Sequence, residues 1–186
     1  MSLALGNKIC SVRATFITPD DENIKIWRYM DFTKLVSLID TKKLYFTRAD
    51  KFDDPFEGSY PKLNILGREA FFKDLNERKE VAGQGNTFKP PEIFKHMPKY
   101  TAVNCWHMNP YESVAMLSLY LKSDEGVAIQ STFSRLKESF LTKEDLYIGT
   151  VKYINYETEF VDPTNLYSPF VHKRKSFEHE KNKSIG

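Results

Sequence analysis

The spacing of apolar residues changes from strand-like to helical early in the chain. Apolar and mixed residues alternate over residues 24–30, which predicts a half-buried strand. Asp31 follows as the predicted N-cap of a helix. The apolar face of this helix falls at helical spacing on Phe32, Leu35, Val36 and Ile39. Residues 44–47 form a short β-prone run, so we expect the chain to open as strand, helix, strand.

Helices and strands continue to alternate along the rest of the chain. Helices are predicted over residues 66–81, 91–97, 113–120 and 133–140, with a last helical segment from about His172. Strands are predicted over residues 100–106 and 126–130, and within 147–156. This order predicts an α/β (mixed α+β) fold with a small mixed or antiparallel sheet and flanking helices. We expect residues 24–186 to form one globular domain and residues 1–23 to be a weakly ordered N-terminal segment.

Composition narrows the classes of function. Hydrophobic residues make up 41% of the 186 positions, enough for a core, and the formal net charge is only +2. Such a balance predicts no long-range attraction to nucleic acid or to an anionic membrane. The sequence contains no apolar run of about 18 residues, the length that a membrane span needs. Cys10 and Cys105 lie far apart, and the four histidines are scattered, so we expect a reduced, cytoplasmic protein without a bound metal.

The residues from Phe52 to Gly58 concentrate carboxylates on a predicted loop. Asp53, Asp54 and Glu57 lie within five positions of one another, and Pro55 excludes a helix or central strand there. A cation or a catalytic arginine would suit such a group of carboxylates. The structural alternative is that Asp53 or Asp54 caps the turn and Glu57 pairs with a nearby Lys or Arg.

Arg28 lies inside the first predicted strand, where an unpaired guanidinium would be costly. The guanidinium can bind a phosphate or a carboxylate of a ligand through two parallel hydrogen bonds. The alternative is an internal salt bridge to Asp53, Asp54 or Glu57. Both interpretations stay open from the residues alone.

Basic residues gather near the end of the chain. Lys173, Arg174 and Lys175 follow His172, with Phe170 and Phe177 nearby, so the segment could contact nucleic acid through charge and stacking. The alternative is a solvated helix face whose lysines pair with Glu178 and Glu180.

Several blocks of residues resemble the bacterial domain of unknown function 2971. They are residues 27–29, 44–47, 52–58, 105–106 and 125–129, Tyr120, Lys173 with Arg174, Phe177 and Glu180. The resemblance covers roughly residues 24–181, and the block Asp53 to Glu57 is the most distinctive part of it. That family implies no particular activity.

The last residues depart from the pattern of that family. Asn182 and Ser184 stand where the family has a Glu and an Arg, and the chain ends at Gly186. A C-terminally truncated member is therefore expected, with a sheet edge left unpaired through which the protein could form oligomers.

The order of a strand with Arg28, a helix and Leu44 to Thr47 also resembles the start of ADP-ribosyltransferase-like domains. That resemblance implies that Arg28 holds NAD with Ser131 or Thr132, and that Glu178 or Glu180 orients the nucleophile. NAD would then be the substrate and a nucleic acid or protein the acceptor, with Arg28 and Glu180 as the catalytic residues. The alternative is a non-catalytic binding domain in a bacterial stress or phage-defence setting, so whether the protein is an enzyme stays open.

Overall fold

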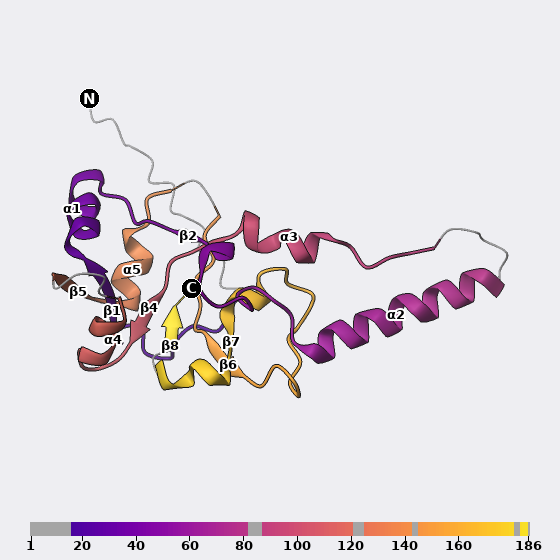
Figure 1. Cartoon of the computed structure of the whole chain (residues 1–186). Helices are drawn as coiled ribbons and strands as arrows, with labels where there is room; N and C mark the ends of the chain where they lie inside the picture. The colour runs from indigo at the N-terminus through magenta and orange to yellow at the C-terminus, as the bar shows by residue number, and fades with distance from the viewer. Residues whose placement is uncertain (1–15, 82–86, 121–124, 143–144, 181–182, 186) are drawn as a thin grey trace, which may run out of the picture. The chain divides into compact units, whose positions relative to one another are not determined.

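The computed structural model describes residues 16–81, 87–120, 125–142, 145–180 and 183–185 (Figure 1). The expected weakly ordered segment therefore lies largely outside the described residues, since these begin at Phe16. The chain divides into two compact units. The first unit takes its residues from 1–45, 104–151 and 182–186, and the second from 46–103 and 152–181. A single domain over residues 24–186 stays a prediction.

An antiparallel four-stranded sheet forms the centre of the first unit. Its strands are β1 (Lys25–Asp31), β4 (Trp106–Met108), β5 (Gly126–Thr132) and β8 (Lys183–Ile185), in the order β5-β1-β4-β8. Ile26 of β1 pairs with Ser131 of β5, and Arg28 pairs with Ile129. Because side chains alternate across a strand, these four residues share one face of the sheet. Trp27 and Tyr29 point to the other face.

Helices pack against both faces of this sheet: α1 (Phe32–Thr41), α4 (Val114–Tyr120) and α5 (Phe133–Ser139) (Figure 1). The face with Ile26 carries the main core, made of Ile26, Trp106, Met108, Phe133, Leu136 and Ile148. A smaller cluster of Trp27, Tyr29 and Met116 occupies the other face. Asp31 caps α1 as predicted, since its side chain accepts a hydrogen bond from the Lys34 amide at 2.9 Å.

The second unit has short strands and one long helix. The strands are β2 (Thr47–Arg48), β3 (Ala102–Val103), β6 (Lys152–Ile154) and β7 (His172–Arg174), and β2 pairs with β3 while β6 runs parallel to β7. The helices are α2 (Lys62–Val81) and α3 (Ile93–Tyr100), with 3-10 turns η1 (Ala49–Lys51), η2 (Ser168–Val171) and η3 (Lys175–Glu180). Among the described residues, no helix is both long enough and apolar enough to cross a membrane.

These elements confirm the α/β fold class predicted from the residue pattern, and three details of the pattern are wrong. The last segment from His172 begins as strand β7 and continues as a 3-10 helix, because it pairs with β6. The strand predicted over residues 100–106 is divided between β3 and β4, with Asn104 and Cys105 between them. The strand expected over residues 44–47 is limited to Thr47, which begins β2. The helix expected after Asp31 does form as α1, and its apolar residues Phe32, Val36 and Ile39 are largely exposed.

Candidate functional site

The guanidinium of Arg28 is bound by oxygen atoms of the first unit. One of its terminal nitrogens donates to the Asn104 Oδ1 at 2.8 Å and to the Cys105 carbonyl at 2.9 Å. The other donates to the Tyr45 carbonyl at 3.4 Å. The Arg28 side chain also lies over the Trp106 ring, with 6.0 Å between the guanidinium carbon and the ring centroid. Arg28 thereby joins β1 to the segment before β4 and to the residues that follow α1.

Asn104 completes this arrangement, and the sequence pattern did not single it out. Asn104 is only 6% exposed. The Oδ1 atom accepts from Arg28 and from the Trp106 indole nitrogen, the latter at 2.7 Å. Its Nδ2 atom donates to the Tyr45 carbonyl at 2.7 Å. One buried amide thus meets three partners, and the residue pattern, which predicted a continuous strand over residues 100–106, contained no signal for this role.

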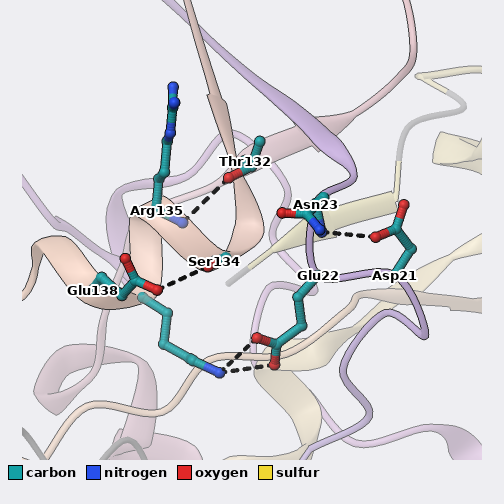
Figure 2. Close-up of polar contacts among 8 residues, drawn as sticks. Asp21, Glu22, Asn23, Thr132, Ser134, Arg135 and Glu138 are labelled. Atoms are coloured by element: carbon teal, nitrogen blue, oxygen red, sulfur yellow. Dashed lines mark hydrogen bonds and ion pairs between the residues drawn. The ribbon is translucent and has the colours of Figure 1, made fainter.

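Ser131 and Thr132, the residues expected to bind NAD with Arg28, lie on opposite faces of β5. Ser131 shares the face of Arg28, and Thr132 points the other way. Thr132 also has a local role, since its Oγ1 atom accepts the Arg135 amide at 3.2 Å and so caps α5 (Figure 2). The register therefore favours Ser131 over Thr132 as a neighbour of Arg28.

Residues 52–58 of the second unit, which we call the acidic loop, lie against β7. Asp54 pairs with Arg174 at 2.7 Å and also accepts the Phe56 amide at 3.0 Å, which closes the turn. Glu57 lies 3.7 Å from the Lys173 ammonium, and the Glu57 side chain is only 3% exposed. Asp53 is exposed. Asp54 and Glu57 thus take the structural roles that the residue pattern offered as the alternative to ligand binding.

Aromatic rings surround the Arg174 guanidinium. Its central carbon lies 4.1 Å from the Phe56 ring centroid and 5.2 Å from that of Phe177. Phe56 is 45% exposed, so its ring covers Arg174 at the surface and is not part of the core. Two blocks that carry the resemblance to family 2971, residues 52–58 and Lys173 with Arg174, are therefore in contact.

Burial perturbs two titratable groups next to this cluster. It lowers the pKa of His172, whose Nδ1 atom lies 2.7 Å from the Ser168 carbonyl. Burial also raises the pKa of the Tyr156 hydroxyl, and the carboxylates of Glu57 and Asp54 add to that rise. The Tyr156 hydroxyl donates to the His172 carbonyl at 3.0 Å. Burial thus favours the neutral form of both groups, and the Tyr156 hydroxyl supports the backbone of β7 through its hydrogen bond.

The expected nucleic-acid contact and the expected late glutamate lie in and after β7. Lys173 and Arg174 are engaged by the acidic loop, and Lys175 lies 3.4 Å from Glu159. Glu180 ends η3, but the side chains of Glu178 and Glu180 fall outside the described part of the structure, as does Asn182. Within the described residues, no three His, Cys, Asp or Glu side chains converge as metal ligands.

Cys105 and His107 lie on either side of Trp106 and differ in burial. Cys105 is half-buried, whereas His107 is only 3% exposed. The His107 ring lies 5.6 Å from the Tyr29 ring, on the face of the sheet opposite Arg28.

No protein-family model, curated protein or solved structure matches this chain. Membership of family 2971 and an ADP-ribosyltransferase-like architecture therefore stay predictions.

Proposed function

We propose that this protein is a non-catalytic binding domain. The observation that carries the proposal is the engagement of Arg28, whose guanidinium donates to Asn104, Cys105 and Tyr45 of its own unit. In the second unit, Asp54 and Glu57 are likewise paired with Arg174 and Lys173. Side chains whose chemistry would suit catalysis thus form hydrogen bonds and ion pairs with other residues of the protein.

A protein partner fits the exposed surface better than a nucleic acid does. Lys173 and Arg174, the basic residues expected to contact nucleic acid, face carboxylates of the acidic loop. Helix α2 exposes large apolar side chains, with Leu63 41%, Leu66 50% and Phe71 62% exposed. Apolar side chains grouped on one helix are typical of surfaces that other proteins cover.

Titration with NAD, followed by NMR, tests this proposal. A non-catalytic domain that does not use NAD leaves the amide signals of Arg28 and Ser131 unchanged up to millimolar NAD. It also transfers no label from NAD to protein, DNA or RNA. Saturable shifts at these two residues, together with label transfer, would contradict the proposal.

Binding of NAD by the first unit is the second candidate function, and one observation favours it. Arg28 and Ser131 lie on the same face of two adjacent antiparallel strands. A guanidinium and a hydroxyl placed in this way could hold a phosphate and a ribose hydroxyl of a dinucleotide.

Two neighbouring substitutions separate this second candidate from a purely structural role. Ser131→Ala removes a hydroxyl on the face of Arg28, and Thr132→Ala removes the cap of α5 from the other face. If NAD binds, Ser131→Ala weakens binding with little loss of stability, whereas Thr132→Ala lowers stability by about 1 kcal/mol and leaves the affinity unchanged. Equal NAD affinity of both variants and the wild type would rule out a role for this face.

A further inference from the structure

Strand β5 lies at an open edge of the four-stranded sheet, at the outer margin of the first unit (Figure 1). It pairs with β1 along all seven of its residues, from Thr132 opposite Lys25 to Gly126 opposite Asp31. Among the described residues, no other strand pairs with it. This edge is not the one expected from a C-terminal truncation, because the described end of the chain forms β8 next to β4, at the opposite end of the sheet.

The hydrogen bonds at the two ends of β5 define which of its backbone groups face outward. The Phe133 amide donates to the Ile24 carbonyl, and the Phe32 amide donates to the Glu125 carbonyl. In an antiparallel pair, such bonded positions recur at every second residue. The odd-numbered residues of β5 therefore bond to β1. The even-numbered residues Gly126, Ala128 and Gln130 direct their N–H and C=O groups to the open edge, whereas the Thr132 carbonyl accepts the Ser131 hydroxyl at 3.5 Å and Thr132 caps α5.

Strand β5 itself has none of the sequence features that usually prevent strands from adding to a sheet. Residues 126–132 contain no charged side chain and no proline, and their pairing with β1 has no bulge. Within the described structure, no strand pairs with the outward N–H and C=O groups of Gly126, Ala128 and Gln130, and such a row is a template for a further strand.

We propose that two copies of this protein associate through antiparallel pairing of β5 with β5 of the partner. The register that overlaps the whole strand places Ile129 opposite its own copy on a twofold axis. In this register Ala128 lies opposite Gln130, and Gly126 opposite Thr132. Even-numbered residues thus meet even-numbered residues throughout, and the two sheets become continuous.

Charges at the two ends of β5 complement each other in this register. Glu125 precedes the strand, and Arg135 lies in the first turn of α5, where its side chain projects away from the other polar groups (Figure 2). Within the described structure, neither side chain has an ion-pair partner. Glu125 of each copy approaches Arg135 of the other, so the twofold axis creates the contact at both ends.

Apolar surface beside the strand adds to what the association buries. Helix α1 contacts β5 and exposes Phe32, Val36 and Ile39 by 50%, 49% and 66%. Pairing of two strands alone buries less surface than the about 1,200 Å² that stable interfaces bury. Additional apolar contact of this kind is therefore required.

Sedimentation equilibrium of the full chain tests the proposal through two substitutions at one position. We expect the wild type to sediment at twice the 21.7 kDa mass of the chain. Gln130→Pro removes an outward N–H without removing a bond to β1, so we expect a monomer. Gln130→Ala keeps that N–H and is expected to remain a dimer. A monomeric wild type at hundreds of micromolar would overturn the proposal, as would equal dimerisation of the two variants.

A charge exchange on exposed side chains provides a second test that does not alter the backbone. Glu125→Arg or Arg135→Glu alone is expected to weaken dimerisation on the order of tenfold, because each copy then presents like charges. The combined variant E125R/R135E restores opposite charges and is expected to recover the affinity of the wild type. Failure of the combined variant to recover would overturn the proposed register. This inference does not depend on whether the protein binds NAD.

Discussion

The Arg28 guanidinium donates to the Oδ1 atom of Asn104 across 2.8 Å, and the same oxygen accepts the Trp106 indole nitrogen. A buried amide oxygen that serves two donors lowers the cost of placing an arginine in a sheet. Arg28 is in this way part of the core structure of the first unit.

Asn104→Ala is expected to lower the free energy of unfolding by about 2–4 kcal/mol, because Arg28 and Trp106 both lose an acceptor. Trp27 and Trp106 are the two tryptophans of the chain, and both lie in the first unit. Urea unfolding followed by tryptophan fluorescence therefore measures the effect where it occurs. Asn23→Ala, at an exposed asparagine of the same unit, is the control and should change stability by less than about 0.5 kcal/mol. A similar small change for Asn104→Ala would contradict the role of this amide.

Two glycines of the second unit should respond to alanine in opposite ways. Gly58 has φ +71, and a Cβ atom there would lie 2.3 Å from the Phe170 ring. Gly58→Ala is therefore expected to destabilise the acidic loop by more than about 1 kcal/mol. A Cβ atom at Gly67 in helix α2 meets nothing within 4 Å, so Gly67→Ala should stabilise the helix by up to about 1 kcal/mol. Amide hydrogen exchange of each segment measures both effects, and the same sign for the two variants would contradict the local geometry.

Asp31 should make helix α1 sensitive to acid. The hydroxyl of Thr33, and then the Lys34 amide, lower the pKa of the Asp31 carboxyl to about 2. The pKa of Asp31 in the folded protein lies below its ordinary value of 3.8, so the unfolded chain takes up the proton first. The stabilisation is thus complete above about pH 4 and is lost as the pH falls towards 2.

The backbone chemical shifts of α1 along a pH titration measure this loss. Asp31→Asn keeps a capping side chain without a charge, so the pH dependence of α1 should become weaker while the helix persists at pH 7. If the pH dependence of α1 is unchanged in this variant, a group other than Asp31 causes it.

Arg174 is expected to hold the acidic loop against β7. Arg174→Ala leaves Asp54 without its partner and uncovers Phe56, so the free energy of exchange protection of the Phe56 and Ser59 amides, which are hydrogen-bonded within the loop, should fall by about 2 kcal/mol. Lys175→Ala, which removes an exposed pair with Glu159, is the matched control and should have little effect on the loop. Equal protection of the loop in both variants would show that the Asp54 pair does not hold it.

Local signals in the sequence were sufficient for much of the fold. The Asp31 cap, the strand around Arg28 and the helix that starts at Phe133 each follow from nearby residues, and the structure confirms them. Asn104 was missed because its partners, Arg28 and Tyr45, are remote in sequence. The strand at His172 was assigned to a helix because its pairing with β6 is likewise non-local.

The residue pattern also could not predict the exposure of helix α1 or the partners of the loop carboxylates. Helical spacing predicts an apolar face on α1, but it does not show whether another element covers that face. The pairing of Asp54 with Arg174 joins residues 120 positions apart, and only the folded chain brings them together. The pattern correctly offered a structural role for the loop carboxylates, but it did not identify their partners.

The free energy of unfolding of Arg28→Ala, from urea titration with tryptophan fluorescence, tests the structural role of Arg28 most directly. If Arg28 holds the first unit together through Asn104, Cys105 and Tyr45, the variant loses about 2–4 kcal/mol of stability. A variant as stable as the wild type would contradict this role and would direct attention to a ligand of Arg28.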